Sequence, residues 1–253
     1  MAFKKCVECR ISSLTTEQKQ EMLNLMSRFY DNVHPDVFYS DLLEKDVVLL
    51  FYSRPGKLKG FSTQKIFSHC FAGQAYRVFF SGDTIIDPGS WGSIDFPVLF
   101  IRWMLSTWSQ QPETPAVWML ICKGMRVYRL LPLFFETYAP SCDRSTDHKV
   151  QALMHDLGRT RYPSRYDPDK GIVKVVHNSN YLTSRLAGST NFRAKNRHIR
   201  FFHEKNPGYA TGDELLCLAG IHPENIRPAL LNRLRQNGVA LKSEKGSWTF
   251  AAV

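Results

Sequence analysis

The sequence lacks long apolar runs. None approaches the ~20 consecutive apolar residues that a helix needs to cross a bilayer. The N-terminal stretch MAFKKCVECRISS contains two lysines but no apolar core of the kind found in secretion signals. With 43% hydrophobic and 13% aromatic residues, the chain also differs from disordered proteins, which have too little apolar surface to fold. We therefore expect a globular, cytoplasmic protein.

Paired metal-binding motifs are also missing from the sequence. Cys6 and Cys9 form one CxxC, and no second close pair of cysteine or histidine residues supplies the other ligands of a zinc site. Cys70, Cys122 and Cys217 lie in apolar stretches, where a free thiol behaves as a small hydrophobic group. The spacing therefore predicts no metal.

Acidic residues are fewer than basic ones, 23 against 33, so the net charge is +10. The excess is concentrated between Asp143 and Lys205, where thirteen Lys or Arg stand against six Asp or Glu. Such a surface favours anionic partners. The charge thus indicates a phosphate-bearing cofactor, an acidic carrier protein or a nucleic acid.

The periodicity of apolar residues predicts alternating helices and strands. Thr15 and Gln18 have capping-box spacing, which indicates a helix that begins there. Up to Pro140 the order is two helices, three strands, a helix, a strand and a helix, over 15–32, 34–46, 46–53, 58–67, 76–86, 96–109, 116–122 and 126–140. Beyond it we expect a short helix and a basic loop, a strand at 171–176, a short strand or helix near 199–203, helices at 213–220 and 223–238, and a hairpin at 239–250.

The stretch FFSGDTIIDPGSWGSIDF, residues 79–96, joins a strand to an apolar helix through a loop with two glycines. Such a junction can be an ordinary turn. It can also cradle an anionic ligand, because a helix N-terminus offers free backbone N–H groups and a favourable dipole. The local sequence is compatible with both interpretations.

The order of elements and this loop together resemble the GNAT superfamily of acyl-CoA-dependent N-acyltransferases over residues 11–140. In that fold two helices precede a β-hairpin, and a long strand then runs into an acyl-CoA loop and a helix. The family motif is Gln/Arg-x-x-Gly-x-Gly/Ala, preceded by a hydrophobic residue, any residue and a proline. Residues 86–88 match this lead-in and Gly92 matches the first glycine, whereas Gly89 and Ile94 depart from the motif.

The resemblance implies a GNAT-like α/β (α+β) fold: a mixed, mainly antiparallel sheet flanked by helices, with a C-terminal extension of helices and a hairpin. Residues 1–140 would form the acyltransferase core. Residues 141–253 would form a basic extension that completes the acceptor or partner site. The acyl donor, acyl-CoA or the acyl-phosphopantetheine of an acyl carrier protein, would bind at Ile86, Pro88, Gly89, Ser90, Trp91, Gly92 and Ser93.

The resemblance also implies two catalytic residues. Asp83, on the strand before the loop, would be the base that removes a proton from the amine, and Tyr128 would protonate the leaving thiolate. Alternatively, Asp83 caps a bulge made by Gly82 or pairs with a lysine, and Tyr128 is a core tyrosine with a satisfied hydroxyl. His69 and Glu136 are further candidates, each more typical of a structural role.

The function that these features favour is transfer of an acyl group, which can be a long fatty acyl chain, to an amine of a peptide or small metabolite. The apolar stretches 96–109 and 128–138 would line a tunnel for such a chain or simply form the core. One alternative is nucleic-acid binding, because 193–205 interleaves basic and aromatic residues and 223–250 has the helix-then-hairpin order of a winged helix. Another is a GNAT-like module that binds without catalysis.

Overall fold

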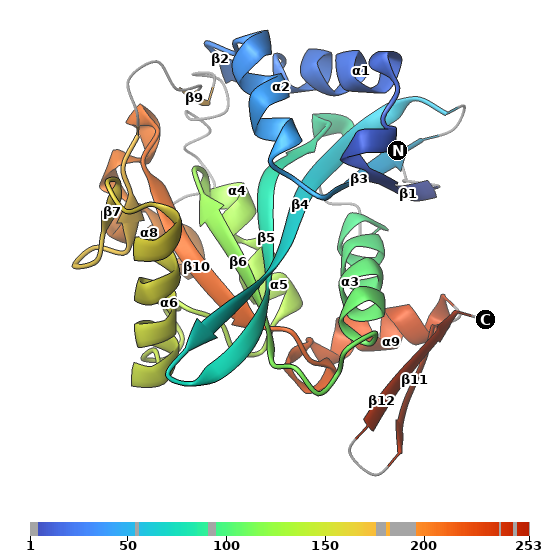
Figure 1. Ribbon diagram of the computed structural model, residues 1–253, viewed down its shortest axis with the longest axis vertical. Helices are drawn as coiled ribbons and strands as arrows, with labels where there is room; N and C mark the ends of the chain where they lie inside the picture. The colour runs from blue at the N-terminus through green and yellow to red at the C-terminus, as the bar shows by residue number, and fades with distance from the viewer. Residues whose placement is uncertain are drawn as a thin grey trace.

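A central eight-stranded sheet organises the computed structural model, which describes residues 5–53, 56–90, 95–175, 181–182, 196–237, 239–244 and 247–252 (Figure 1). Among the described residues, every neighbouring pair of strands in this sheet is antiparallel except β5 and β6, which are parallel. The sheet is therefore mixed and mainly antiparallel, as predicted. Its strands, in spatial order, are β1 (Lys5–Arg10), β3 (Val47–Tyr52), β4 (Leu58–Phe71), β5 (Gln74–Ile86), β6 (Ala116–Cys122), β10 (Glu214–Gly220), β8 (Ile172–Val173) and β7 (Tyr166–Asp167).

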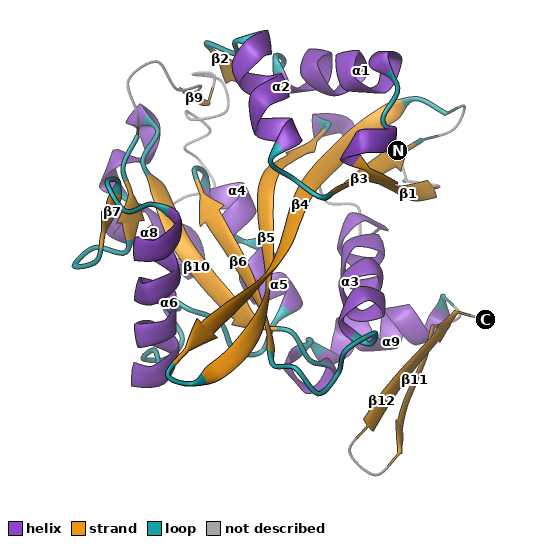
Figure 2. Ribbon diagram, in the orientation of Figure 1, coloured by secondary structure: helices purple, strands orange, loops and turns teal. Residues whose placement is uncertain are grey.

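Helices cover both faces of the sheet (Figure 2). The Thr15 side chain accepts from the Gln18 N–H, and the Gln18 side chain accepts from the Thr15 N–H, which confirms the predicted capping box. Two short antiparallel pairs lie outside the main sheet: β2 (Tyr30–Asp31) with β9 (Tyr181–Leu182), and β11 (Val239–Glu244) with β12 (Ser247–Ala252). The helices are α1 (Thr16–Met26), α2 (Pro35–Leu43), α3 (Asp95–Trp108), α4 (Met125–Tyr128), α5 (Leu130–Phe134), α6 (His148–Arg161), α8 (Arg197–Lys205) and α9 (Pro228–Gln236).

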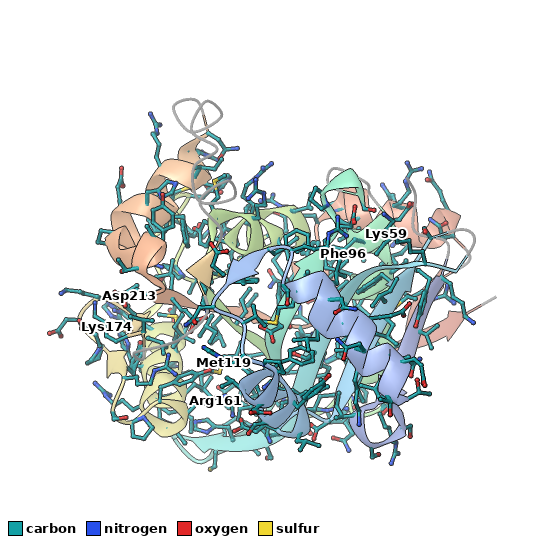
Figure 3. The ribbon with its side chains drawn as sticks, turned by 90° about the horizontal axis from the view of Figure 1, so that it is seen from above. Lys59, Phe96, Met119, Arg161, Lys174 and Asp213 are labelled. Atoms are coloured by element: carbon teal, nitrogen blue, oxygen red, sulfur yellow. The ribbon has the colours of Figure 1, made fainter. Side chains whose placement is uncertain are left out.

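Three apolar clusters hold these layers together. On one face, α1 and α2 pack against Leu50 and Phe61, and α6 packs further along against Val78 and Met119. Arg161 of α6, labelled in Figure 3, also lies with its guanidinium carbon 4.2 Å from the centre of the Phe80 ring. The opposite face carries α3, α5 and α9.

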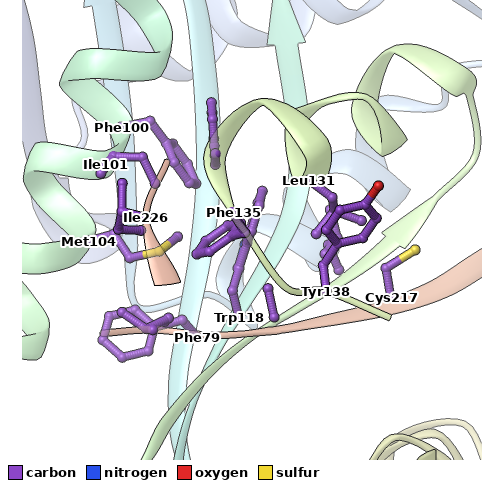
Figure 4. Close-up of a cluster of buried hydrophobic side chains, with 14 of the residues drawn as sticks. Phe79, Phe100, Ile101, Met104, Trp118, Leu131, Phe135, Tyr138, Cys217 and Ile226 are labelled. Carbon is purple, nitrogen blue, oxygen red and sulfur yellow. The ribbon is translucent and has the colours of Figure 1, made fainter. Parts of the chain in front are cut away.

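Aromatic rings fill the core on the face of α3 and α5 (Figure 4). Phe134 of α5 stacks on Trp118 of β6 and on Phe100 of α3, with both pairs of ring centres 5.9 Å apart. These apolar stretches were expected to form either the core or a tunnel, and the contacts described for them are core contacts. Their burial fixes the position of α3 relative to β5 and β6.

The helix predicted over 213–220 is wrong, because Glu214–Gly220 forms strand β10 between β6 and β8. Leu215 and Cys217 pack into the cluster under α3, whereas Leu216 and Leu218 pack under α6. A strand buried on both faces reads as a continuous apolar run, and a short run of this kind does not distinguish a strand from a helix.

The helix predicted over 126–140 is shorter and interrupted. It forms α4 and α5, after which the chain is extended and Ala139 bridges to Leu218 of β10. Pro132 accounts for the interruption, since it has no N–H to donate to the Tyr128 carbonyl and its ring clashes with that carbonyl.

Strand β1 was not predicted, and it contains the CxxC motif. Cys6 packs against the cluster under α3, whereas Cys9 packs against the cluster under α1 and α2. Residues three apart on a strand point to opposite faces of the sheet, so the two thiols do not converge. Among the described helices, none is both long and apolar enough to span a bilayer.

Candidate active site

Strand β5 carries a β-bulge at Gly82 and Asp83. These two residues lie opposite a single residue of β4, Thr63. A bulge bends its strand and redirects the side chains on it, which is why bulges are common beside active sites. The alternative interpretation of Asp83, that it caps a bulge made by Gly82, is confirmed for the bulge itself, and the capping role stays a prediction. The bulge also places Asp83 outside the regular ladder.

The parallel pairing of β5 with β6 ends just before the bulge, at Ser81 and Leu120. Beyond that point the two ribbons part toward their C-terminal ends (Figure 1). Asp83 on β5 and Lys123, which follows β6, both lie past the end of the ladder. The splayed end of the β5–β6 pair is thus the candidate active site.

A buried lysine lies against the bulge. Lys45 is only 5% exposed, and its Nζ donates to the Asp41 carboxylate at 2.7 Å and to the Asp41 carbonyl at 2.9 Å. A Cβ atom at position 82 would lie 2.7 Å from Lys45 Cε, closer than carbon atoms approach. The missing side chain of Gly82 is therefore what allows Lys45 to lie against β5.

Three further polar side chains, Lys123, Glu214 and Tyr30, interact electrostatically with Asp83 from other parts of the chain. Lys123 Nζ lies 3.9 Å from Glu214 Oε1, at the start of β10, and 5.6 Å from the ring centre of Tyr30 in β2. Glu214 Oε2 lies 3.8 Å from Arg165 Nη2. The antiparallel pairing of β10 with β6 brings Glu214 beside Lys123, because Leu215 and Cys122 are direct partners.

The charges around Asp83 leave it with an unusual proton affinity. Burial, and to a smaller extent the nearby Asp41 carboxylate, raises the pKa of Asp83, and Lys123 and Lys45 oppose the increase, so that the pKa is about 6. Burial likewise raises the pKa of Glu214, against the effect of Lys123. A carboxylate with a pKa near 6 is ionised at neutral pH and still basic enough to accept a proton from a reacting group.

Four of these groups were missed in the sequence: Tyr30, Lys45, Lys123 and Glu214. Two of them could have been found from the sequence, because a charged residue at the end of a buried strand is costly unless it is paired or functional. Lys123 directly follows the apolar run 116–122, and Glu214 directly precedes another such run. Glu214 was not recognised because the apolar run that follows it was predicted to be a helix.

A line of buried hydrogen bonds crosses three strands next to the bulge. Trp118 Nε1 donates to Ser81 Oγ at 2.7 Å, and Ser81 Oγ donates to Gln64 Oε1 at 2.8 Å. Gln64 Nε2 then donates to Ser62 Oγ at 2.7 Å, and Ser62 lies 2.7 Å from the Thr84 hydroxyl. These bonds tie β4, β5 and β6 together on both sides of Asp83 and hold the bulge in place.

The first part of the predicted acyl-donor loop is a tight 3₁₀ turn, Pro88–Ser90. The Gly89 N–H donates to Asp87 Oδ1 at 3.0 Å, and the Ser90 N–H donates to the Asp87 carbonyl at 2.8 Å. Arg28 and Lys59 lie 3.0 and 3.3 Å from Asp87 Oδ2. The Asp87 carboxylate thus occupies the position between an amide and two cations that a ligand anion would take.

Burial alone would raise the pKa of Asp87, but the Gly89 N–H, Arg28 and Lys59 outweigh it and lower the pKa. Asp87 is therefore a stable internal anion at neutral pH. Ile86, also predicted to bind the donor, pairs with Gly60 in the ladder. Three predicted donor-binding residues, Trp91, Gly92 and Ser93, lie outside the described residues.

Tyr128, the predicted acid, lies in the core. Its side chain is 0% exposed, and its hydroxyl donates to the Pro140 carbonyl at 3.0 Å. Its ring packs against Tyr138, Phe201 and Phe202. Burial raises the pKa of Tyr128 above its usual value. These are the contacts of a core tyrosine with a satisfied hydroxyl, so its role as the acid stays a prediction.

The two reserve candidates have ion-pair partners elsewhere. His69 Nε2 lies 2.8 Å from Asp156 Oδ2, between β4 and α6. Glu136 Oε2 lies 2.9 Å from Arg227 Nη1, just before α9. Each pair links two elements of the fold, which is the structural role considered for them.

The basic stretch 193–205 is described from residue 196 onward and includes α8. Ile199 and Phe202 are buried, and Arg197 is paired with Asp143 at 2.9 Å. Phe202 is therefore unavailable for stacking on a nucleic-acid base, and α8 is packed as part of the fold. The nucleic-acid alternative loses one of its stacking residues.

No protein-family model matches the sequence, and no curated protein matches it. Solved structures with limited likeness include a probable N-acyltransferase from Enterococcus faecalis, with 16% identity, a TM-score of 0.39, and 53% of this chain and 33% of that chain covered. NAA60 from Arabidopsis thaliana, in complex with a bisubstrate analogue, has 13% identity and a TM-score of 0.37, and the match covers 53% of this chain and 86% of that chain. An aminoglycoside 6'-N-acetyltransferase from Acinetobacter baumannii has 14% identity and a TM-score of 0.35, and the match covers 60% of this chain and 88% of that chain.

The chain thus spans about a third of the length of the Enterococcus protein. The order of its own elements, two helices, the β3–β4 hairpin, long β5, α3, β6 and α4, is the order that the resemblance implied. The pairing of these strands in one mixed sheet agrees with it as well. The protein therefore has a GNAT-like α/β fold.

Proposed function

We propose that the chain is an N-acyltransferase that uses Asp83 as its general base. The observation that supports this best is the position of Asp83, on a bulge at the splayed end of β5 and β6, with its pKa raised to about 6. The donor is a thioester of coenzyme A or of acyl-phosphopantetheine, and the acceptor is an amine on a peptide or small metabolite. The acyl group can be as long as a fatty acyl chain.

The proposed reaction needs one base and one acid. The amine nitrogen attacks the thioester carbonyl carbon, so a C–N bond forms as the C–S bond breaks. The proton of the amine passes to Asp83, directly or through a water molecule, and the leaving thiolate takes a proton. We assign that second proton to Tyr128, whose hydroxyl must first leave the Pro140 carbonyl to which it donates.

The donor is proposed to bind at the loop that follows β5. The Asp87 carboxylate already holds the Gly89 amide, Arg28 and Lys59 there, so a pyrophosphate would have to compete with it. This supports a donor with fewer phosphate contacts, such as the phosphopantetheine of an acidic carrier protein. The basic region 141–253 is proposed to complete the acceptor or carrier side.

Thioester turnover tests the function directly. The purified chain is mixed with acetyl-CoA, a long-chain acyl-CoA or an acyl carrier protein thioester, together with a peptide amine or a polyamine. Release of free thiol and mass spectrometry of the acceptor measure transfer. We expect Asp83→Asn to reduce turnover by roughly 10²–10⁴-fold, the usual contribution of a general base.

The matched control is Asp169→Asn, an exposed aspartate away from the site, and we expect it to retain wild-type turnover. Unchanged turnover in Asp83→Asn would remove Asp83 from the mechanism. No transfer with any donor, together with salt-sensitive binding of DNA or RNA at physiological ionic strength, would favour the nucleic-acid alternative instead.

A further inference from the structure

Three side chains of metal-ligand type meet away from Asp83, at the start of α8. Cys142 Sγ lies 3.1 Å from His198 Nδ1 and 3.3 Å from Asp143 Oδ1. One ligand atom from each of the three residues lies within 4.8 Å of the other two. The reaction proposed above assigns no step to this cluster, which joins segments more than fifty positions apart.

Several contacts hold the histidine in position. The Asn196 side chain caps α8 by accepting from the N–H groups of His198 and Ile199. Ile199 is buried, so the first turn of the helix is anchored in the core. The Tyr138 hydroxyl lies 3.3 Å from His198 Nδ1, the nitrogen that also faces Cys142 Sγ. The helix cap and the buried Ile199 thus hold the imidazole beside the thiol.

A cavity of about 650 Å³ opens beside the cluster. Cys142 and Asp143 line it together with three basic side chains, Arg144, Arg197 and Arg200, and one further acidic side chain, Glu204. Arg197 Nη2 lies 2.9 Å from Asp143 Oδ1 and holds the carboxylate at the wall of the cavity. A ligand in this cavity would contact the cluster and the arginines together.

We propose that Cys142, Asp143 and His198 bind one zinc-class divalent ion, with a fourth position open to the cavity. Thiolate, imidazole and carboxylate are the three ligand types that zinc prefers, and three protein ligands with one open position are typical of reactive zinc sites. The thiolate and the carboxylate offset the charge of the ion. Binding releases the thiol proton to solvent.

The open position is suited to an anionic ligand. Such a ligand would complete the coordination of the ion and would be paired by Arg144 and Arg200 on the cavity wall. The sequence predicted no metal because that prediction used linear spacing, and neighbours in the chain supply only two of these ligands. Folding of α8 against the segment at 142 supplies the third.

Metal binding to the intact chain tests the proposal. Metal-free protein is titrated with Zn²⁺ by calorimetry, and with Co²⁺ while the thiolate-to-cobalt charge-transfer absorption is recorded. We expect one ion per wild-type chain and a clear charge-transfer band. Cys142→Ser should abolish the band, and His198→Ala should weaken Zn²⁺ affinity by more than the roughly 10–100-fold that changes to outer-shell partners cause.

The control variant is Cys70→Ser, which removes an exposed thiol of β4, and it should bind both ions as the wild type does. A second measurement uses only wild-type protein: Zn²⁺ should slow alkylation of Cys142, located by peptide mass spectrometry, and leave alkylation of Cys70 unchanged. Absence of Zn²⁺ binding by the wild type, or equal alkylation of Cys142 with and without Zn²⁺, would overturn the proposal. Neither result depends on acyltransferase activity.

Discussion

At the scale of single residues, Asp83 illustrates how opposing charges set a proton affinity. Burial and Asp41 disfavour the carboxylate, whereas Lys45 and Lys123 favour it. The net result is a pKa of about 6, which lies between that of an exposed aspartate and the neutral range. This balance makes Asp83 sensitive to small movements of its neighbours, and its titration can be measured in two independent ways.

The first measurement is the pH dependence of acyl transfer. Because the base must be ionised, we expect kcat to rise with pH through an apparent pKa near 6 and then to level off. The measurement is thiol release between pH 5 and 8 at saturating donor and acceptor. A profile without a limb near 6 would contradict the assignment of Asp83 as the base.

The second measurement is thermal stability against pH. The folded-state pKa of Asp83 is raised, so the folded protein binds more protons than the unfolded chain between about pH 4 and 6, and its stability falls as pH rises through that window. Asp83→Asn removes this loss. We expect the gain in melting temperature of Asp83→Asn over wild type to be larger at pH 8 than at pH 4.

An equal gain at pH 4 and pH 8 would mean that burial of Asp83 does not disfavour its charged form. The exposed control Asp169→Asn should show no gain that grows with pH. Together with the kinetic profile, these melts separate a catalytic from a structural effect, because loss of turnover with increased stability at pH 8 is not the result of unfolding.

Gly82 controls the position of Lys45 and thereby the charge near Asp83. In Gly82→Ala, the added Cβ would lie 2.7 Å from Lys45 Cε and 2.7 Å from Thr63 Oγ1, so the lysine must move. Since Lys45 lowers the pKa of Asp83, its displacement should raise the apparent pKa in the pH dependence of kcat. An unchanged apparent pKa of kcat in an active, folded Gly82→Ala protein would show that Lys45 does not act on Asp83.

At the scale of elements, the buried hydrogen-bond line across β4, β5 and β6 supports the bulge. Ser81→Ala would leave Trp118 Nε1 without its acceptor and Gln64 Oε1 without its donor, both in buried positions. We expect a loss of about 1–3 kcal/mol in the free energy of unfolding, measured with urea. Ser68→Ala, at an exposed position of β4, should change it by less than about 0.5 kcal/mol.

A Ser81→Ala protein as stable as wild type would show that water replaces the lost partner. With the predicted loss, turnover provides a further test of the bulge. If the line of hydrogen bonds holds Asp83 in place, the turnover of Ser81→Ala should fall even under conditions where the protein is fully folded.

At the scale of the whole molecule, the sheet joins the two halves of the chain. Strand β10, from the second half of the chain, pairs with Val117–Cys122 of β6, from the first half. Strand β8 pairs with the other edge of β10. Lys174 Nζ and Asp213 Oδ2, 2.7 Å apart, link the segments that flank this pairing (Figure 3). The division at about residue 140 stays a prediction, and the sheet makes it testable.

We expect residues 1–140 alone not to fold cooperatively. Without β10, the buried apolar strand β6 would become an exposed edge, and such an edge promotes aggregation. The measurement is a thermal melt followed by circular dichroism, with the full chain as the control. A soluble fragment with a sharp melt would show that residues 1–140 form an independent domain.

Much of the fold could be predicted from the sequence because its signals are local. The capping box of α1, the β3–β4 hairpin and the apolar helix α3 each depend on residues close together in the chain. Strand β10 could not be identified in this way, since a short run buried on both faces has the same apolar composition in a strand or a helix. Edge strand β1, KCVECR, has no fully buried residue and lacks the strict alternation of apolar and polar residues that predicts a strand.

The sequence by itself determined the alternation of helices and strands that resembles the GNAT superfamily, and it placed Asp83 within the strand that precedes the loop. Only the tertiary structure decided what surrounds Asp83. Lys45, Lys123 and Glu214 reach it through the bulge in β5 and the register of β10 on β6. Only the tertiary structure, likewise, brings Cys142 and His198 together, because they lie far apart in the sequence. Local patterns depend on near neighbours, whereas the proton affinity of a group depends on every charge that folding brings close to it.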